Sequence, residues 1–423
     1  MLRTVGLGGA YLPRYLDAEV EELLAGLPAV ALDGPKAVGK TETATRHCDA
    51  VLNLDSADVR QAYELDSAGL LTREARVCVD EWQRQPEVWD RVRRLVDARV
   101  PTKFLLTGSA SPHDGVDTHS GAARIVSLRM RPLSLAERRS TRPTISLADL
   151  FEGTAALTGS CDFTHRDYAR EICSSGFPAI NELPPKLRRH ALEGYATRII
   201  DRDLVDMGMR VRRPESLRAW MTAYAAASST DAAYSTILNA ATAGDGDKPA
   251  KASVQVYRNL LDKIWVLDPV PAWTPSVQPL GRLTVGDKHQ LCDPGLAAHL
   301  LGVTEEKLTS GAAGTAELFG QLFESLATLA VRAAATSAEA KVFHLRTRGG
   351  RQEVDLIVER FDGTVLGIEV KLAKTITDRH VEHLHWLGER IGDRLVDKIV
   401  LYAGDTAGRR SDGVALIPLA MLY

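Results

Sequence analysis

The residues best suited to chemistry form a glycine-rich run close to the N-terminal end of the chain. Gly34-Pro35-Lys36-Ala37-Val38-Gly39-Lys40-Thr41 has the spacing of a phosphate-binding loop. The two glycines let backbone N–H groups turn inward toward phosphate oxygens, and the positive end of a following helix dipole adds to the attraction. In this pattern Lys40 reaches the β- and γ-phosphates, and Thr41 places its hydroxyl on Mg²⁺. The run therefore predicts that the protein binds ATP together with Mg²⁺.

The segments around this loop predict the elements that such a loop requires. Residues 28–33 are a short apolar run bounded by proline and glycine, which is typical of a buried strand in a parallel sheet. Residues 41–46 have the composition of a helix start. A strand, the loop and a helix thus follow one another in the expected order.

A second strand, predicted over residues 76–80, ends in two adjacent carboxylates. Asp80 is placed to hold Mg²⁺, directly or through water, and Glu81 to polarise the attacking water as a general base. A strand that simply ends in solvated acids is the alternative interpretation.

A third apolar strand, residues 103–108, ends in small polar residues. Ser109 or Thr107 is expected to contact the γ-phosphate or the attacking water. Open α/β sheets bind their ligands at the carboxyl edge of the strands, so the three strand ends predict one nucleotide site at this edge.

Composition limits the class of protein. The chain has 423 residues, of which 45% are hydrophobic and 25% charged, and its formal net charge is −3. These values are typical of a globular protein with two or three domains, and any contact with nucleic acid must be local. Five scattered cysteines predict neither a disulfide framework nor a zinc cluster. No signal pattern and no apolar stretch of membrane length is visible, so we expect no membrane partner and a cytoplasmic protein.

The pattern changes along the chain in three parts. Residues 1–150 predict the parallel α/β domain, and residues 151–300 are mostly helical. Within the second part, residues 214–272 predict three helices and a short extended run, the order of a winged helix-turn-helix. Such a module contacts DNA in some proteins and only packs against other domains in many. The sequence leaves open whether the module contacts DNA through Lys251, Gln255 and Arg258. It also leaves open whether the basic run at 186–218 binds DNA phosphates or is only a solvated helix face.

The third part, residues 315–423, returns to an α/β pattern. Two strands, 353–358 and 365–371, flank an Asp-Gly turn, and a turn centred between positions 362 and 363 sets Asp355 opposite position 370, one step from Glu369. Glu369 and Lys371 share one face of their strand, and Glu324 in an upstream helix is expected at the same place. Carboxylates grouped in this way bind Mg²⁺. The arrangement resembles the PD-(D/E)xK nuclease core, although acids on an exposed hairpin are also common.

Taken in order, the motifs are similar to those of a widespread prokaryotic ATP-binding family that joins an AAA-like P-loop domain to a C-terminal domain of unknown function. The resemblance implies an AAA-type ATPase core with ATP and Mg²⁺ as ligands, a winged-helix-like middle and a nuclease-like C-terminal fold. It also implies a role for Arg124 as an arginine finger, which in trans would require a homo-oligomer. The motifs that carry the resemblance are residues 11–14, 34–41, 80–83, 107–109, 131–134, 176–178, 292–296, 322–324, 353–355 and 369–371.

Three positions depart from the family pattern. Lys36 stands where an arginine is usual, Glu42 replaces a second threonine after the loop lysine, and Ala123 replaces the glycine before Arg124. The extra negative charge of Glu42 is expected to weaken nucleotide binding.

Three functional hypotheses follow. The first is a Mg²⁺-dependent ATPase that drives domain movement on DNA or on a DNA-bound partner. The second is an ATP-gated, metal-dependent DNA nuclease. The third is a non-enzymatic, ATP-binding regulator of the antitoxin kind.

Overall fold

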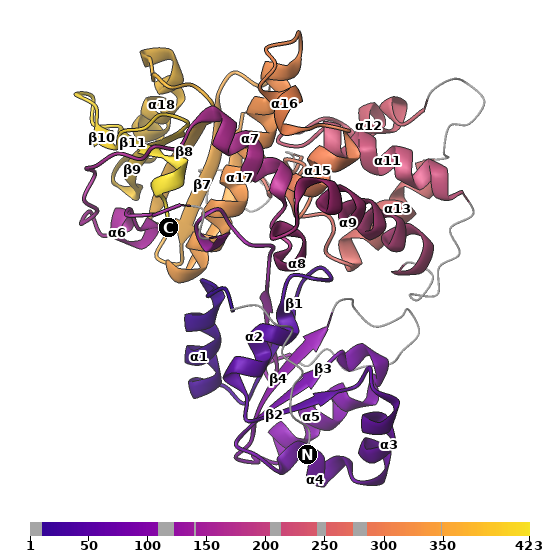
Figure 1. Ribbon diagram of the computed structural model, residues 1–423. Helices are drawn as coiled ribbons and strands as arrows, with labels where there is room; N and C mark the ends of the chain where they lie inside the picture. Colours follow the sequence, from indigo (N-terminus) through magenta and orange to yellow (C-terminus); the bar gives the residue numbers. More distant parts are fainter. Residues whose placement is uncertain are drawn as a thin grey trace. The chain divides into compact units, whose positions relative to one another are not determined.

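The computed structural model describes residues 11–108, 122–138, 141–203, 213–242, 251–273, 286–347 and 349–423 (Figure 1). The chain divides into two compact units. The first consists of residues 1–131, 201–211 and 259–266, and the second of residues 132–200, 212–258 and 267–423.

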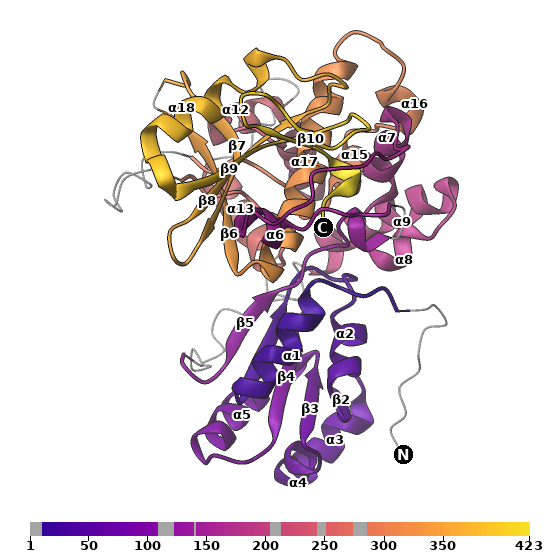
Figure 2. The ribbon, with the colours of Figure 1, turned by 90° about the vertical axis from the view of Figure 1, so that its left-hand side faces the viewer.

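The first unit contains a five-stranded sheet in which every pairing is parallel (Figure 2). Its order is β2-β3-β4-β1-β5, so β4 lies between β1 and β3. This order brings the carboxyl ends of the three predicted strands next to one another. The strands are β1 (Ala29–Asp33), β2 (Ala50–Asn53), β3 (Arg76–Asp80), β4 (Lys103–Gly108) and β5 (Val126–Arg129).

Helices on this sheet close an apolar core. Helix α5 carries an apolar stripe in which Val92 is buried, while Trp89, Leu95 and Val96 pack partly buried against the core. The short 3₁₀ turn Trp82–Arg84 separates β3 from this helix. The helices of the unit are α1 (Leu16–Gly26), α2 (Lys40–His47), α3 (Ala57–Leu65), α4 (Ser67–Thr72) and α5 (Glu87–Asp97).

The second unit contains a six-stranded mixed sheet in the order β10-β11-β9-β8-β7-β6. The pairs β6–β7 and β7–β8 are antiparallel, whereas β8–β9 and β9–β11 are parallel. The protein is therefore an α/β protein, as predicted. The strands are β6 (Ala340–Arg346), β7 (Glu353–Arg360), β8 (Val365–Lys371), β9 (Leu395–Tyr402), β10 (Gly408–Arg409) and β11 (Ala415–Pro418).

Two helices matter most for this sheet. The long helix α17 (Thr315–Ser337) contacts β6 and β8, and α18 (Glu382–Ile391) contacts β7, β8 and β9. Of the helices in the described part of the chain, none has the length and apolar character needed to cross a membrane.

The described parts of residues 147–308 contain shorter helices separated by irregular stretches. The three helices predicted for the middle module are present as α11, α12 and α13, and the short run after them forms isolated bridges, from Leu267 to Leu291 and from Val270 to Lys288. The helices are α6 (Leu147–Phe151), α7 (His165–Ser174), α8 (Pro178–Asn181), α9 (Pro185–Arg198), α11 (Pro214–Ala226), α12 (Tyr234–Ala240), α13 (Lys251–Lys263), α15 (Pro294–Leu300) and α16 (Glu305–Leu308).

The register predicted for the β7–β8 hairpin is wrong by one residue. Leu356 pairs with Ile368, and the N–H of Arg360 donates to the carbonyl of Thr364 at 3.0 Å. The turn holds three residues instead of two, and Gly363 adopts a left-handed conformation (φ 85°) that a three-residue hairpin turn favours. Continued by one pair, the observed register sets Asp355 opposite Glu369, so the two acids converge more closely than the sequence predicts.

Candidate nucleotide site and candidate metal cluster

The loop between β1 and α2 is curled by residues in left-handed conformations. Gly39 has φ 100° and Ala37 has φ 65°. A Cβ atom on Gly34 would lie 2.2 Å from the carbonyl oxygen of Met130, so no other residue fits there without moving the backbone directly after β5. The loop therefore has the conformation that turns successive N–H groups toward an anion.

Lys40 begins α2 and is buried, with 6% of its surface exposed. Its Nζ donates to the carbonyl oxygens of Gly34 and Pro35 at 2.7 and 2.8 Å. Burial lowers the pKa of Lys40 to about 8, against the opposing effect of nearby carboxylates, of which Glu81 is the strongest. The ammonium is thus bound to neutral oxygens of its own loop, which leaves its charge available for a phosphate.

The two predicted Mg²⁺ ligands are brought together. The hydroxyl of Thr41 donates to Oδ1 of Asp80 at 2.9 Å, and the hydroxyl of Thr107 donates to the same oxygen. Asp80 is 3% exposed. A carboxylate and a hydroxyl side by side are oxygen ligands of the kind that Mg²⁺ prefers, so these residues fit the ion.

Glu81 follows Asp80 in a left-handed conformation (φ 54°, ψ 43°), which is uncommon for a residue with a side chain. The amide of Gln83 donates to its carboxylate. Burial and the neighbouring Asp80 raise the pKa of Glu81. A strained backbone and a raised pKa are both typical of a positioned general base.

Asp33 is a site residue that the sequence analysis missed. It ends β1, and burial raises the pKa of its carboxyl, while Ser127, Lys40 and Arg129 act in the opposite direction. Its position directly before Gly34 is the only signal in the sequence.

Arg14 is the second missed residue. It is 8% exposed, and its guanidinium donates to the carbonyl of Val38 in the loop at 2.9 Å and to that of Arg131 at 2.6 Å. In the same motif, the Tyr11 hydroxyl lies 3.0 Å from that of Thr43 in α2. The motif at 11–14 is visible in the sequence. Its hydrogen bonds to the loop and to Arg131 join residues that are far apart along the chain, so the sequence does not reveal them.

Lys36 differs from the other loop residues. It was predicted as part of the phosphate cradle, and it forms an ion pair of 2.5 Å with Asp203. Its charge is therefore already matched by a carboxylate within the first unit.

One of the predicted catalytic residues is not brought to this edge, and another lies outside the described residues. Arg124 precedes β5 at the amino edge of the parallel sheet, the edge opposite the loop, and its Nε lies 3.0 Å from Oδ1 of Asp97. It cannot reach the loop of its own chain, so a role in trans stays a prediction. Ser109 lies outside the described residues, and Thr107 is the polar residue of β4 that contacts Asp80.

The predicted acids of the second unit do converge. Lys371 pairs with Glu369 at 2.5 Å and with Asp355 at 3.1 Å, and Glu324 reaches the same cluster. A lysine that the sequence analysis missed, Lys288, lies among these carboxylates. Across the described ranges, no group of three or more histidine, cysteine or acidic residues has the geometry of a metal site.

The predicted DNA-contact residues are in part engaged within the chain. Arg258 stacks on the ring of Tyr234 at 4.3 Å, and Arg218 of the basic run pairs with Glu193 at 2.6 Å. The side chain of Lys251 lies outside the described part of the structure. Contact with DNA through these residues stays a prediction.

Comparison with protein families agrees with the P-loop geometry. Residues 27–138 match the family described as AAA domain. Residues 319–422 match a domain of unknown function, DUF4143, and residues 165–307 match another, DUF8612. The chain joins an AAA domain to a DUF4143 domain. This confirms the resemblance at the level of an AAA domain joined to a C-terminal domain of unknown function, and ATP binding is supported at the level of the AAA domain.

Relatives and solved structures complete the comparison. Uncharacterized protein Rv2008c of Mycobacterium tuberculosis and uncharacterized protein Mb2031c of Mycobacterium bovis are each 26% identical over 430 residues, covering 95% of this chain and 82% of theirs. The Walker-type ATPase PABY2304 of Pyrococcus abyssi aligns with a TM-score of 0.40 at 14% identity, covering 67% of this chain and 94% of its own. A chain of Drosophila ORC bound to DNA aligns with a TM-score of 0.25 at 15% identity, covering 71% and 96%.

Proposed function

We propose that the protein is a Mg²⁺-dependent ATPase whose nucleotide state drives movement of the attached domains on DNA or on a DNA-bound partner. The observation that carries the proposal is the meeting of Lys40, Thr41, Asp80, Glu81 and Thr107 at one edge of the sheet. Three parallel strands end at this edge, and open α/β sheets bind their ligands at the carboxyl ends of their strands.

Each residue has a distinct role in the proposed reaction. The loop amides and Lys40 bind the phosphates, and Thr41 with Asp80 would hold Mg²⁺, which when bound neutralises charge on the β- and γ-phosphates. Glu81 accepts the proton of the water whose oxygen attacks the γ-phosphorus, while the bond to the ADP oxygen breaks. The raised pKa of Glu81 makes its carboxylate a better proton acceptor than an exposed glutamate.

ATP turnover by the purified full chain tests the proposal. We expect ATP turnover that requires Mg²⁺. The substitution Glu81→Gln should lower the turnover rate about 100-fold or more and leave ATP affinity unchanged, because it removes only the proton acceptor. Glu87→Gln, at an exposed acid in the first turn of α5, is the matched control and should leave turnover unchanged.

Nucleotide binding without turnover would contradict hydrolysis. It would support the regulator hypothesis instead, in which ATP only holds a conformation. The DNA part of the proposal is tested separately, by the effect of duplex DNA on the turnover rate at low and at high salt.

A further inference from the structure

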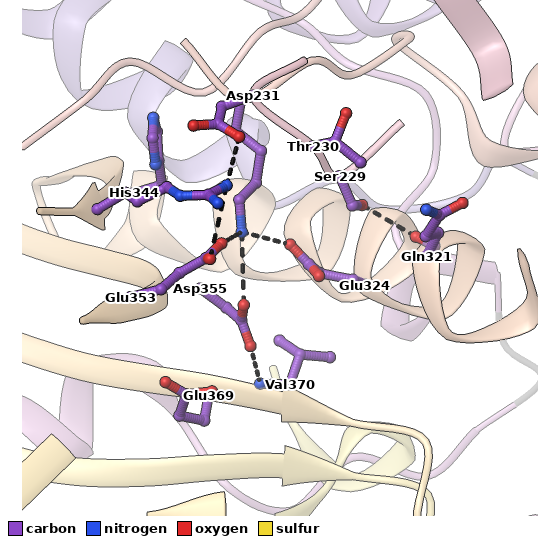
Figure 3. Close-up of polar contacts among 12 residues, drawn as sticks. Ser229, Thr230, Asp231, Gln321, Glu324, His344, Glu353, Asp355, Glu369 and Val370 are labelled. Atoms are coloured by element: carbon purple, nitrogen blue, oxygen red, sulfur yellow. Dashed lines mark hydrogen bonds and ion pairs between the residues drawn. The ribbon is translucent and has the colours of Figure 1, made fainter. Parts of the chain in front are cut away.

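The acid cluster of the second unit is built around the ammonium of Lys288. This side chain is 1% exposed, and its Nζ lies 2.8 Å from Oε1 of Glu324 and 3.4 Å from both Oε1 of Glu353 and Oδ1 of Asp355. Figure 3 shows the carboxylates of Glu324, Glu353 and Asp355 pointing toward one another, from α17 and from β7. The ammonium thus lies at the point where oxygen ligands from two elements meet.

The backbone fixes Lys288 in this position. Its N–H donates to the carbonyl of Val270 at 2.9 Å, and its own carbonyl accepts from the N–H of Val270 at 2.8 Å. The next residue, His289, donates its N–H to the carbonyl of Thr230 at 2.7 Å. The lysine is therefore held by pairing on both sides of the chain rather than by its side chain alone.

A second lysine and an arginine also pair with acids of this cluster. Lys371 pairs with Asp355 and Glu369, and Arg346 pairs with Asp231 and lies 3.8 Å from Glu353. The second oxygen of Asp355 also accepts the N–H of Val370 at 2.9 Å. Both oxygens of Asp355 are thus engaged by donors of the protein.

The electrostatics keep Lys288 charged. Burial lowers the pKa of Lys288, but the carboxylates of Glu324, Asp355 and Glu353 outweigh burial, so its pKa is raised. For Asp355, burial raises the pKa, but Lys371 and Lys288 outweigh it and the pKa is lowered. Lys288 and Asp355 thus stabilise each other in the ionised form. The ammonium of Lys288 plays the electrostatic part that a bound cation plays in a metal site.

From this geometry we propose that Lys288 takes the place of a divalent cation in the nuclease-like acid cluster. A Mg²⁺ ion bound to Glu324 and Asp355 would lie within a few ångströms of the Lys288 ammonium, whose side chain is 1% exposed and whose backbone is held by the pairing with Val270. The second unit then holds no metal at these acids and cleaves no phosphodiester there. Any Mg²⁺ requirement of the protein comes from the nucleotide site.

Mn²⁺ titration of the full chain without nucleotide tests this proposal, with bound ions counted by the loss of the free-ion electron paramagnetic resonance signal. Wild type and Asp355→Asn are expected to bind the same number of ions. Lys288→Ala is expected to bind one more ion per chain and to gain several degrees of melting temperature from Mn²⁺. The additional ion and the thermal gain should both disappear in Lys288→Ala combined with Asp355→Asn.

The controls keep this test decisive. Lys307→Ala removes an exposed lysine of α16 and should behave as wild type. Recovery of folding by Mn²⁺ in an otherwise unfolded Lys288→Ala chain would support the proposal. Loss of one bound ion when Asp355→Asn is introduced into wild type would overturn it, and so would a folded Lys288→Ala chain that binds no further ion. Because ATP is absent throughout, none of these outcomes depends on the proposed hydrolysis.

Discussion

The two units each bury a lysine beside several carboxylates, yet the lysines are bound in opposite ways. In the first unit, Lys40 donates to the backbone carbonyls of Gly34 and Pro35, and its pKa is lowered to about 8. In the second, Lys288 lies within 3.4 Å of three carboxylates, and its pKa is raised.

The difference shows what separates a binding site from a closed cluster. A buried ammonium whose hydrogen bonds go to neutral oxygens keeps its charge for a ligand, and in the proposed function a triphosphate supplies the opposite charge. A buried ammonium that already faces three carboxylates has no such requirement. Residue types alone do not distinguish the two cases, because both regions contain lysine beside acids.

The largest effect is expected on stability, from removal of Lys288. Lys288→Ala leaves Glu324, Glu353 and Asp355 without their shared cation, and such a loss costs about 3–5 kcal/mol of unfolding free energy. Chemical denaturation in the absence of divalent ions measures it, with Lys307→Ala as the exposed control. A loss below about 1 kcal/mol would mean that the acids are already neutral, and the comparison would fail.

Lys40→Ala should instead affect ligand binding. Removal of a charged donor to the phosphates is expected to lower ATP affinity about 100-fold. Calorimetric titration with ATP and Mg²⁺ measures this change. Lys103→Ala, at the opposite end of β4, is the matched control and should retain wild-type affinity. Unchanged affinity in Lys40→Ala would show that the loop does not bind nucleotide through this lysine.

The sequence predicted the first site better than the second because its residues are close together along the chain. The loop, the Asp80-Glu81 pair and their strands follow local rules, and the structure places them at one edge. Arg14 contacts Val38, more than twenty residues further along the chain, and Asp203 pairs with Lys36, more than one hundred residues before it. No local sequence pattern reveals contacts between residues so far apart.

In the second unit, the acids were predicted but the cation between them was not. Lys288 lies in an irregular segment, and its backbone partner Val270 is not in a named strand. The hairpin register was wrong because an Asp-Gly pair fits both two- and three-residue turns. These features are decided by tertiary packing and not by local composition.

The dependence of stability on pH separates the two lysines further. In the nucleotide-free protein, the pKa of Lys40 is about 8, below the ordinary value of 10.5 in the unfolded chain. Between these values the unfolded state binds more protons, so stability rises with pH. From pH 8.5 to 10 we expect a contribution of about 2 kcal/mol. The difference between wild type and Lys40→Met in chemical denaturation isolates it, and a difference that does not change with pH would contradict the lowered pKa.

The acid cluster should show the opposite sign in a lower pH range. Burial raises the pKa of Glu324 to about 7, although Lys288 opposes the shift, whereas the unfolded value is 4.5. Between pH 4.5 and 7 the folded state binds more protons, so this group stabilises the protein most at low pH and the contribution is lost as the pH rises. From pH 5.5 to 6.5 the expected loss is about 1 kcal/mol.

Glu324→Gln keeps the shape of the side chain and removes its titration. The difference in unfolding free energy between wild type and this variant should therefore change with pH by the expected amount. Glu317→Gln, at an exposed acid in the first turn of α17, is the matched control. If the difference between wild type and Glu324→Gln instead did not change with pH over this range, Glu324 would be ionised throughout. Lys288 would then face three full negative charges, which would make its replacement of a divalent ion more complete rather than less.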